Sequence, residues 1–496
     1  MEQSELIKSR RGEPWRETLR KKYTGKERTS FARVTMPSLD GGYRAHNHEE
    51  VSLGLSPEEA MDEARRCLDC VNPTCMQGCP VSIHIPSFVK NIERGDFLEA
   101  ARVIRETSSL PGVCGRVCPQ EKQCEANCIY TLKMGKPAVA IGFLERFAAD
   151  KERESIQADN ETGKETPAPD LKGKKKVAVA GSGPAGLSCA GDLAKYGYDV
   201  TVFEALHELG GVLRYGIPEF RLPNDIVDFE IDQMRALGVK FETNTIIGKT
   251  MSYEDLKAEG FEAIFVGSGA GLPRFMHIPG ENLVGVMSSN EYLTRVNLMR
   301  AGTSGSDTPV SKGRRVAVIG GGNTAMDSVR TALRLGAERA MIVYRRSEAE
   351  MPARLEEVHH AKEEGVEFLT LHNPAEYLDN GKGRVRAMRV QKMELGEPDA
   401  SGRRSPVPIE GAIEEIEVDE VIVSVGVSPN PLIPQTFTGL NVSKRDTVIV
   451  NPDNNETDLP DVFAGGDIVR GGATVILAMG DGRKAAAGIH AYLSQK

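Results

Sequence analysis

The strongest constraint on this chain is a glycine-rich turn that joins a short apolar strand to a helix. Residues 174–186 read KKKVAVAGSGPAG, and their apolar part, 177–180, leads directly into Gly-x-Gly-x-x-Gly. A helix is expected over 187–196, and a second strand over 199–203 ends at Glu204. This strand–turn–helix–strand order predicts a Rossmann-type dinucleotide-binding unit.

Each part of this motif has a mechanical role. The first glycine permits a tight turn, the second lets a pyrophosphate approach the backbone, and the third lets the helix pack against the strand. The helix N-terminus offers free N–H groups to phosphates, and a terminal acid accepts hydrogen bonds from a ribose. A glycine turn without a ligand is the weaker alternative, because every element of the motif is in place. The predicted dinucleotide contacts are Gly181, Gly183, Pro184, Ala185, Gly186 and Glu204.

Two later segments indicate that this dinucleotide is FAD. Residues 209–223 are punctuated by Gly and Pro and carry two arginines, a pattern too irregular for a helix or a strand. Near the C-terminus a short strand ends at Gly466 and Asp467, and a helix is expected over 473–493. In flavoproteins with two dinucleotide domains such an acid binds the ribityl chain, and the helix N-terminus points at the flavin pyrimidine. Taken alone, Asp467 would be interpreted as an ordinary helix cap.

A second turn of the same type begins at residue 315. It reads RVAVIGGGNTA and precedes a helix expected over 326–335 and a strand over 339–343. This strand ends in two arginines rather than an acid. Arginines suit a 2′-phosphate where a carboxylate would suit a 2′-hydroxyl, so the pattern favours NADPH over NADH, with a solvated basic turn as the alternative. The predicted NADPH contacts are Gly320, Gly322, Asn323, Thr324, Ala325, Arg345 and Arg346.

Cysteine is unevenly distributed, with eight of the nine cysteines between residues 67 and 128. In a reducing cytosol such crowding indicates metal ligation rather than disulfides. Two groups of four, each with a Cys-Pro, flank an apolar stretch over 85–104 that we expect to be a helix. Zinc is the alternative, but this grouping favours two iron–sulfur clusters. The groups are Cys67, Cys70, Cys75 and Cys79, then Cys114, Cys118, Cys124 and Cys128.

Composition excludes several classes of protein. The net charge of −9 argues against a general nucleic-acid binder. The N-terminus has no apolar core of signal-peptide length, and no run approaches the roughly 18 apolar residues of a membrane span. We therefore expect a cytoplasmic protein without membrane or nucleic-acid partners.

The order of motifs predicts an α/β fold built from two Rossmann-like domains. The NADPH-binding domain is inserted into the FAD-binding domain, and a mainly helical iron–sulfur domain precedes both. A chain of 496 residues has room for two to four domains, and alternating residues over 384–423 predict an antiparallel meander. The predicted boundaries are 1–150 for the iron–sulfur domain, 151–171 for a charged linker, 172–300 and 432–496 for the FAD-binding domain, and 301–431 for the NADPH-binding domain.

In combination these motifs resemble those of the small (beta) subunit of NADPH-dependent glutamate synthase. The resemblance rests on the first cysteine group followed by proline, on PGVCGRVCP at 111–119, on the two glycine turns, on GGVLRYGIPEFRLP at 210–223 and on AGGD at 464–467. It covers the chain from about residue 45. The same module is similar to the large subunit of NADH-dependent reduced ferredoxin:NADP oxidoreductase and to the N-terminal half of dihydropyrimidine dehydrogenase.

The resemblance implies a division of the ligands that spacing alone does not provide. By itself Glu145, in a helix expected over 138–147, is most simply a surface or salt-bridged residue. The resemblance instead makes it an oxygen ligand, with Cys114 as the alternative, and places Arg214 with Gly211 at the FAD. The implied clusters are held by Cys67, Cys70, Cys75 and Cys128, and by Cys79, Cys118, Cys124 and Glu145.

The function implied is electron input. NADPH would pass hydride to FAD, which releases electrons singly to the clusters, and no acid–base or nucleophilic catalytic residue is expected. The expected assembly is a hetero-oligomer with a glutamate synthase large subunit, which makes glutamate from glutamine and 2-oxoglutarate, or with a related flavin/iron–sulfur partner. A homo-oligomer is the alternative assembly. One alternative is the large subunit of the bifurcating ferredoxin:NADP oxidoreductase. The other is a zinc-stabilised scaffold without activity, which a colourless preparation would indicate.

Overall fold

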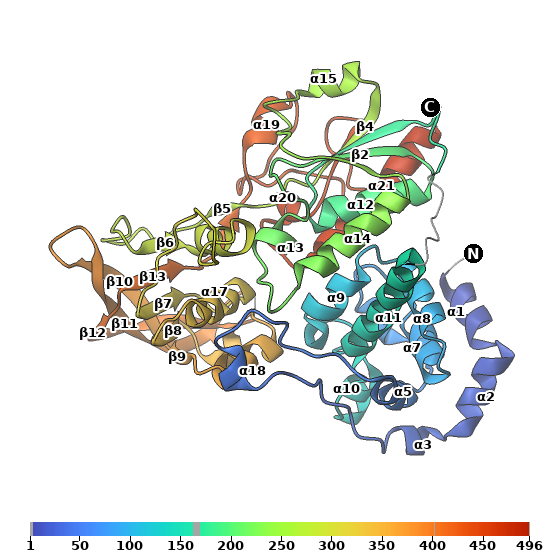
Figure 1. Cartoon of the computed structure of the whole chain (residues 1–496), viewed down its shortest axis with the longest axis horizontal. Coiled ribbons are helices and arrows are strands. Elements are labelled where there is room, and N and C mark those ends of the chain that lie inside the picture. Colours follow the sequence, from blue (N-terminus) through green and yellow to red (C-terminus); the bar gives the residue numbers. More distant parts are fainter. Residues whose placement is uncertain (1–2, 162–168, 401, 496) are drawn as a thin grey trace.

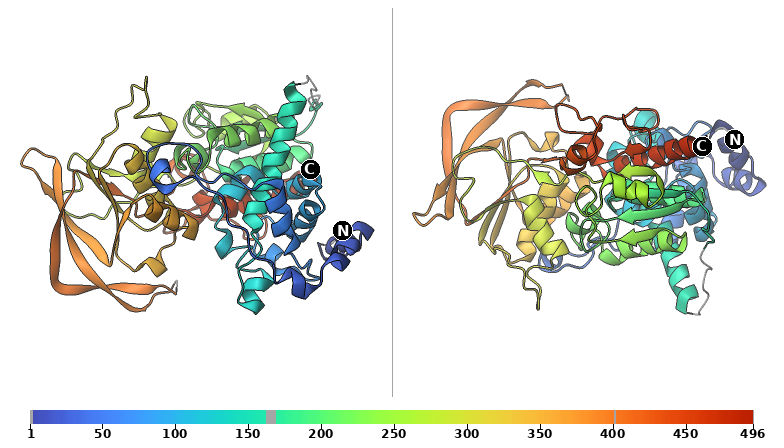
Figure 2. Two further views of the ribbon diagram at one scale, coloured as in Figure 1. Left: turned by 60° about the horizontal axis from the view of Figure 1, so that its bottom comes forward. Right: turned by 90° about the horizontal axis from the view of Figure 1, so that it is seen from above.

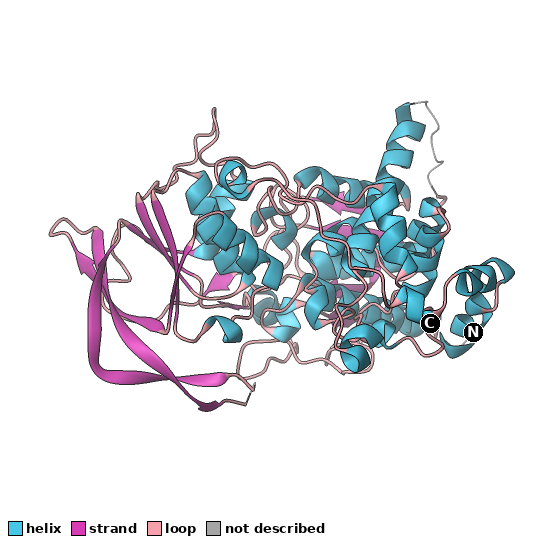
Figure 3. Cartoon of the chain, turned by 90° about the horizontal axis from the view of Figure 1, so that it is seen from below, coloured by secondary structure: helices cyan, strands magenta, loops and turns pink. Residues whose placement is uncertain are grey.

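The computed structural model describes residues 3–161, 169–400 and 402–495. A helical domain at the N-terminal end lies beside the first of two sheet-centred units, and the second unit extends away from both (Figure 1). An antiparallel sheet lies at the end of the molecule opposite the two termini (Figures 2 and 3). The predicted α/β class with a helical N-terminal domain is therefore confirmed.

The N-terminal domain is built from short helices with clear start signals. Ser56 caps the fifth helix in a capping box with Glu59, as S-P-E-E predicts. The apolar stretch over 85–104 forms two helices rather than one, because Gly95 adopts φ +85° and Asp96 caps a new helix. The helices are α1 Gln3–Arg11, α2 Pro14–Lys22, α3 Gly25–Arg28, α4 Gly41–Arg44, α5 Pro57–Arg65, α6 Thr74–Gln77, α7 Ile85–Glu93, α8 Phe97–Arg105, α9 Pro111–Val117, α10 Ile129–Met134 and α11 Ile141–Glu161.

The segment expected to be a linker from residue 151 is helical at its start. Helix α11 continues to Glu161, and residues 162–168 lie outside the described part of the chain. The charged residues from Lys151 onward form helix-compatible contacts, such as the Lys151–Glu154 ion pair at 2.7 Å, one turn apart. Lys and Glu are good helix formers, so a charged stretch without apolar periodicity can still extend a helix that is anchored at its other end.

The first sheet holds five parallel strands in the order β15-β4-β1-β2-β3. Strand β1 is central, and its residues from Val177 on are buried on both faces. Helices α12 and α21 pack so closely that a Cβ atom at Gly482 would lie 2.1 Å from the carbonyl oxygen of Ala185. The elements are β1 Lys176–Ala180, α12 Pro184–Lys195, β2 Asp199–Phe203, α13 Val212–Tyr215, α14 Asn224–Ala236, β3 Lys240–Glu242, α15 Tyr253–Ala258, β4 Phe261–Val266, α19 Leu432–Thr436, β15 Val462–Ala464, α20 Asp467–Arg470 and α21 Val475–Ser494.

The second sheet is also parallel, in the order β6-β13-β7-β8-β9. Strand β6 pairs with β13 here, so the chain has left the first unit well before the expected boundary at residue 300. The crossing occurs at β5 Leu272–Pro273, which pairs with the returning strand β14 Val427–Ser428. The remaining elements are β6 Val286–Ser288, α16 Ser289–Leu293, β7 Arg315–Ile319, α17 Asn323–Arg334, β8 Arg339–Tyr344, α18 Leu355–Glu363, β9 Glu367–Thr370 and β13 Glu420–Val423.

The predicted meander is present as an antiparallel sheet of β10 His372–Asp379, β11 Val385–Pro398 and β12 Arg404–Glu417. The apolar core of the helical domain continues without interruption into the first Rossmann unit. In the described part of the chain, no helix combines the length and the apolar character that crossing a bilayer requires.

Candidate cofactor sites

A cavity of about 580 Å³ runs between the two Rossmann units and is lined by both. The first glycine turn, the second glycine turn and the start of α21 all reach it. Among the described residues, its lining does not include Gly186, Arg214, Gly320, Gly322, Ala325, Arg345 or Arg346. The predicted contacts that do line it are Gly181, Gly183, Pro184, Ala185, Glu204, Gly211, Gly466, Asp467, Asn323 and Thr324.

The three glycines of the first turn differ in what surrounds them. Gly181 adopts φ +107°, which only glycine tolerates without strain. A Cβ atom at Gly186 would lie 1.9 Å from the carbonyl oxygen of Gly181, so the helix can pack here only without a side chain. At Gly183, by contrast, no heavy atom of the described chain lies within 4 Å of a Cβ position. Open space at the start of α12 fits the pyrophosphate of a dinucleotide.

Glu204 is buried at the edge of the cavity and holds the turn in place. Its Oε2 accepts hydrogen bonds from the amide (3.0 Å) and hydroxyl (2.5 Å) of Ser182, and its Oε1 accepts from the amide of Leu206 (2.9 Å). Our sequence analysis did not single out Ser182. A hydroxyl residue between the first two glycines, with an acid at the end of the next strand, is the signal that could have identified it.

The C-terminal motif surrounds the other end of the cavity. Asp467 accepts a hydrogen bond from the amide of Ala473 at 2.9 Å, and burial raises the pKa of its carboxyl. Thr474 caps α21 and lines the cavity, so the positive end of the helix dipole faces it. Arg214, expected at the FAD, instead pairs with Asp228 and donates to the carbonyl of Leu209.

The second glycine turn follows the same geometry. Gly320 adopts φ +143°, and a Cβ atom there would lie 2.3 Å from the carbonyl oxygen of Ser424. The two arginines that were expected at one phosphate lie in different surroundings. Arg345 is exposed, whereas Arg346 is buried and is held by Asp399 (2.6 Å) and by the carbonyl of Arg404 (2.8 Å) in the β11–β12 hairpin.

Four thiols of the helical domain line one small cavity of about 30 Å³. They are Cys67, Cys70, Cys75 and Cys128, the set that the resemblance implies for one cluster. Burial, followed by the neighbouring sulfurs of Cys67 and Cys128, raises the pKa of Cys70 to about 12. Because iron binds the thiolate, assembly of a cluster on these residues would release protons.

The remaining predicted ligands gather at a second place. Cys79, Cys118, Cys124 and Glu145 are electrostatic neighbours of one another. Burial raises the pKa of Glu145 to about 8, with a smaller contribution from Glu230. Among the described residues, the buried Oε1 of Glu145 has no hydrogen-bond partner, which leaves it available to a metal.

Cys114, the alternative ligand, lies at the same place but has a partner of its own. Its Sγ is 3.4 Å from Sδ of Met479 in α21, and the thiol of Cys118 is also its neighbour. Among the described residues no three His, Cys, Asp or Glu side chains converge closely enough to hold a single metal ion. Which of Glu145 and Cys114 completes the second set therefore stays a prediction.

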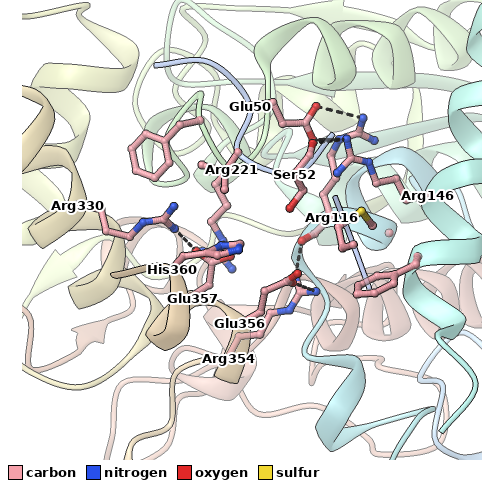
Figure 4. A pocket seen from close by; sticks show the side chains of 15 residues that line it. Glu50, Ser52, Arg116, Arg146, Arg221, Arg330, Arg354, Glu356, Glu357 and His360 are labelled. Atoms are coloured by element: carbon pink, nitrogen blue, oxygen red, sulfur yellow. Dashed lines mark hydrogen bonds and ion pairs between the residues drawn. The ribbon is translucent and has the colours of Figure 1, made fainter. Parts of the chain in front are cut away.

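A further pocket, of about 20 Å³, lies where the helical domain meets the second Rossmann unit (Figure 4). Glu50 bridges Arg116 (2.8 Å) and Arg146 (2.9 Å), while Arg330 pairs with Glu357. The charges are thus matched between neighbouring side chains. We interpret this pocket as a structural joint between domains rather than a ligand site.

Comparison with known proteins supports both halves of this description. Residues 44–157 match the family described as dihydropyrimidine dehydrogenase domain II, 4Fe-4S cluster, and residues 175–482 match pyridine nucleotide-disulphide oxidoreductase. A glutamate synthase (NADPH) small chain from Halomonas elongata is 38% identical over 91% of this chain and 94% of its own length. The beta subunit of an NADP(+)-dependent formate dehydrogenase from Moorella thermoacetica is 39% identical over 86% of this chain and 60% of its own length.

Among solved structures, FprA from Mycobacterium tuberculosis in complex with NADPH is similar with a TM-score of 0.55. The match has 20% sequence identity and covers 65% of this chain and 85% of that one, so it supports the fold alone. The sequence matches reach further, because they extend over both the cysteine-rich domain and the Rossmann units. The chain therefore belongs to the family of glutamate synthase (NADPH) small chains and is an oxidoreductase with an iron–sulfur domain.

Proposed function

We propose that this chain takes electrons from NADPH at a bound FAD and delivers them, by way of two 4Fe-4S clusters, to a glutamate synthase large subunit. The observation that carries the proposal is the position of α21. Its first turn lines the dinucleotide cavity, and one turn later Met479 contacts Cys114. A Cβ atom at the next residue, Gly480, would lie 3.1 Å from the carbonyl oxygen of Pro80, which follows Cys79. One helix thus contacts both kinds of site.

The proposal assigns the cofactors to the residues described above. When bound, FAD supplies the conversion of an electron pair into single electrons, and 4Fe-4S clusters supply single-electron carriers. Of the chain's own groups, Gly183 leaves room for the pyrophosphate, Thr474 places a helix N-terminus at the cavity, and Glu145 presents an unpaired carboxyl oxygen. Arg345 is exposed at the end of β8, where a 2′-phosphate is expected.

The partner is proposed from the relatives. A relative of nearly the same length is named as a glutamate synthase small chain, whereas the formate dehydrogenase subunit is longer than the shared module. The features that this chain shares with both relatives do not distinguish between partners, because the module itself only needs an acceptor of single electrons. A glutamate synthase large subunit is the partner that the name of the Halomonas elongata relative supports.

The test is reconstitution of the complete chain with a glutamate synthase large subunit under anaerobic conditions. We expect NADPH oxidation that requires both glutamine and 2-oxoglutarate and produces glutamate. Replacing Cys75 with Ala should abolish glutamate formation while NADPH still reduces the flavin. The matched control is Cys189→Ala, because Cys189 is a buried core residue of α12 outside both cysteine groups. Activity that requires ferredoxin and NADH instead would contradict the proposed partner.

A further inference from the structure

We propose that the N-terminal arm, defined as residues 3–28, clamps the loop between Cys67 and Cys70 and thereby raises the reduction potential of the cluster that this loop holds. The inference rests on the proposed function, since it requires a cluster on Cys67, Cys70, Cys75 and Cys128. The arm lies outside both family matches, which begin at residues 44 and 175.

Three arginines of the arm converge on one residue of the ligand loop, Asp69. Arg16 donates to its carboxylate through Nε at 3.0 and 3.1 Å and also through Nη2. Arg20 donates through Nη1 at 2.7 Å, and Arg11 donates to the backbone carbonyl at 2.9 Å. The carboxylate of Asp69 is fully buried, and the guanidinium of Arg16 is 3% exposed. Such charge-assisted bonds are shorter and stronger than neutral ones.

The clamp holds Asp69 in a conformation that the residue does not favour on its own. Asp69 adopts φ +51°, in the left-handed region that favours glycine. Asp69 lies between the predicted ligands Cys67 and Cys70, so a held Asp69 fixes the path of the backbone that joins them.

A second set of cations fixes the start of the loop. Nζ of Lys90 donates to the carbonyl of Cys67 at 2.6 Å and pairs with Glu93. Arg28, at the end of the arm, pairs with Glu93 at 3.0 Å and donates to the carbonyl of Arg65. The arm therefore contacts the loop both through its carboxylate and through the residues that lead into it.

These contacts act on a cluster in a defined direction. Nearby positive charge stabilises the more negative, reduced state of a cluster and so raises its potential. Arg16 and Arg20 together outweigh the single negative charge of Asp69. Without them, the buried carboxylate would lose its hydrogen-bonded arginine partners beside the ligand sulfurs, and the loop would lose what holds its backbone between Cys67 and Cys70.

The test uses the complete chain with its cofactors bound and compares Arg16→Gln/Arg20→Gln with the wild type. Redox titration followed by electron paramagnetic resonance should show one cluster shifted to a more negative potential and the other unchanged. Arg16→Lys/Arg20→Lys, which keeps the charges, should restore most of the shift. The matched control is Arg314→Gln, since Arg314 forms an exposed ion pair with Glu338 in the second Rossmann unit, away from the arm and the cysteines.

The outcomes separate the clamp from the function on which it rests. Loss of about half of the iron from the Gln variant, with recovery in the Lys variant, would also support the clamp. The loop between Cys67 and Cys70 would then no longer be fixed, and one of the two clusters would be lost. Full iron content with both potentials unchanged would overturn it, as would an equal shift of both clusters. A wild-type protein that holds no pair of clusters would instead refute the proposed function.

Discussion

At the scale of single residues, the same glycine motif contains positions with opposite physical roles. Gly183 faces open space in the dinucleotide cavity, whereas Gly186 lies in tight contact with the backbone of Gly181. A sequence motif treats the two as equivalent members of one pattern. The structure separates a position that borders open space, where we predict a ligand, from one that is needed for packing.

We therefore expect different results when each glycine is replaced by alanine. Gly183→Ala should keep the free energy of unfolding of the FAD-free protein near the wild-type value but bind FAD at least about tenfold more weakly, because the added methyl group occupies space meant for the pyrophosphate. Gly186→Ala should destabilise the FAD-free protein by about 1–3 kcal/mol, since the clash is with backbone. Urea denaturation and FAD titration measure both quantities. Equal losses of stability in the two variants would contradict this assignment.

The two arginines after β8 are also not equivalent. Arg345→Leu should weaken NADPH binding by about 10-fold or more, the factor that corresponds to losing one charged hydrogen bond, and should leave NADH binding nearly unchanged. Arg346→Leu should have a smaller effect on NADPH, because its guanidinium is already held by Asp399. Calorimetric titration with both nucleotides tests this. A parallel loss of NADH affinity in Arg345→Leu would argue against a 2′-phosphate contact.

At the scale of elements, α21 joins the dinucleotide cavity to the second predicted ligand set, which includes Cys79. Gly480→Val should push the Cys79–Pro80 loop away from this helix, because a Cβ atom there already lies 3.1 Å from the Pro80 carbonyl. We expect NADPH to reduce the flavin at the wild-type rate while electron delivery to the clusters becomes slower. Stopped-flow absorbance separates the two phases. The control is Ala487→Val on the exposed side of the same helix, and equal rates in both variants would count against this contact.

Much of this element order could be predicted from sequence, and the failures have physical causes. The first glycine turn and its flanking strands were predictable because the motif is local: apolar strands, glycines and a terminal acid follow one another within about thirty residues. The break at Gly95 was missed because apolar periodicity continues on both sides of it. Strand β6 was placed in the wrong unit because its partner β13 lies more than a hundred residues away in sequence. The direction of Arg214 depends on Asp228, which no motif includes.

At the scale of the whole molecule, residues 40–52 form a strap between the second Rossmann unit and the rest of the protein. Arg44 is 1% exposed and pairs with Glu364 at 3.0 Å, while α4 lies so close to α18 that a Cβ atom at Gly41 would meet the carbonyl of Glu363 at 2.5 Å. Further along, the amide of Val51 donates to Phe220 in the first unit. The strap fixes the two units relative to each other around the shared cavity.

Removing its buried charge should loosen this arrangement. Arg44→Met should lower the free energy of unfolding by about 2–3 kcal/mol, somewhat less than for an isolated buried pair, because Glu364 keeps Arg330 and Arg334 as partners. Faster amide hydrogen exchange in α18 should accompany the loss. Arg65→Met, which removes an exposed pair with Asp62, should change stability by less than about 0.5 kcal/mol. Similar effects of the two substitutions would show that the strap does not fix the units.

The central claim is that one chain receives paired electrons from NADPH and passes them singly toward its cysteine-held iron. The most direct test is anaerobic addition of NADPH to the purified chain alone, with FAD and both clusters assembled. The account predicts that flavin absorbance falls promptly and that an electron paramagnetic resonance signal of reduced iron–sulfur clusters follows, with NADH far less effective. Flavin absorbance that stays unchanged on adding NADPH would contradict the account.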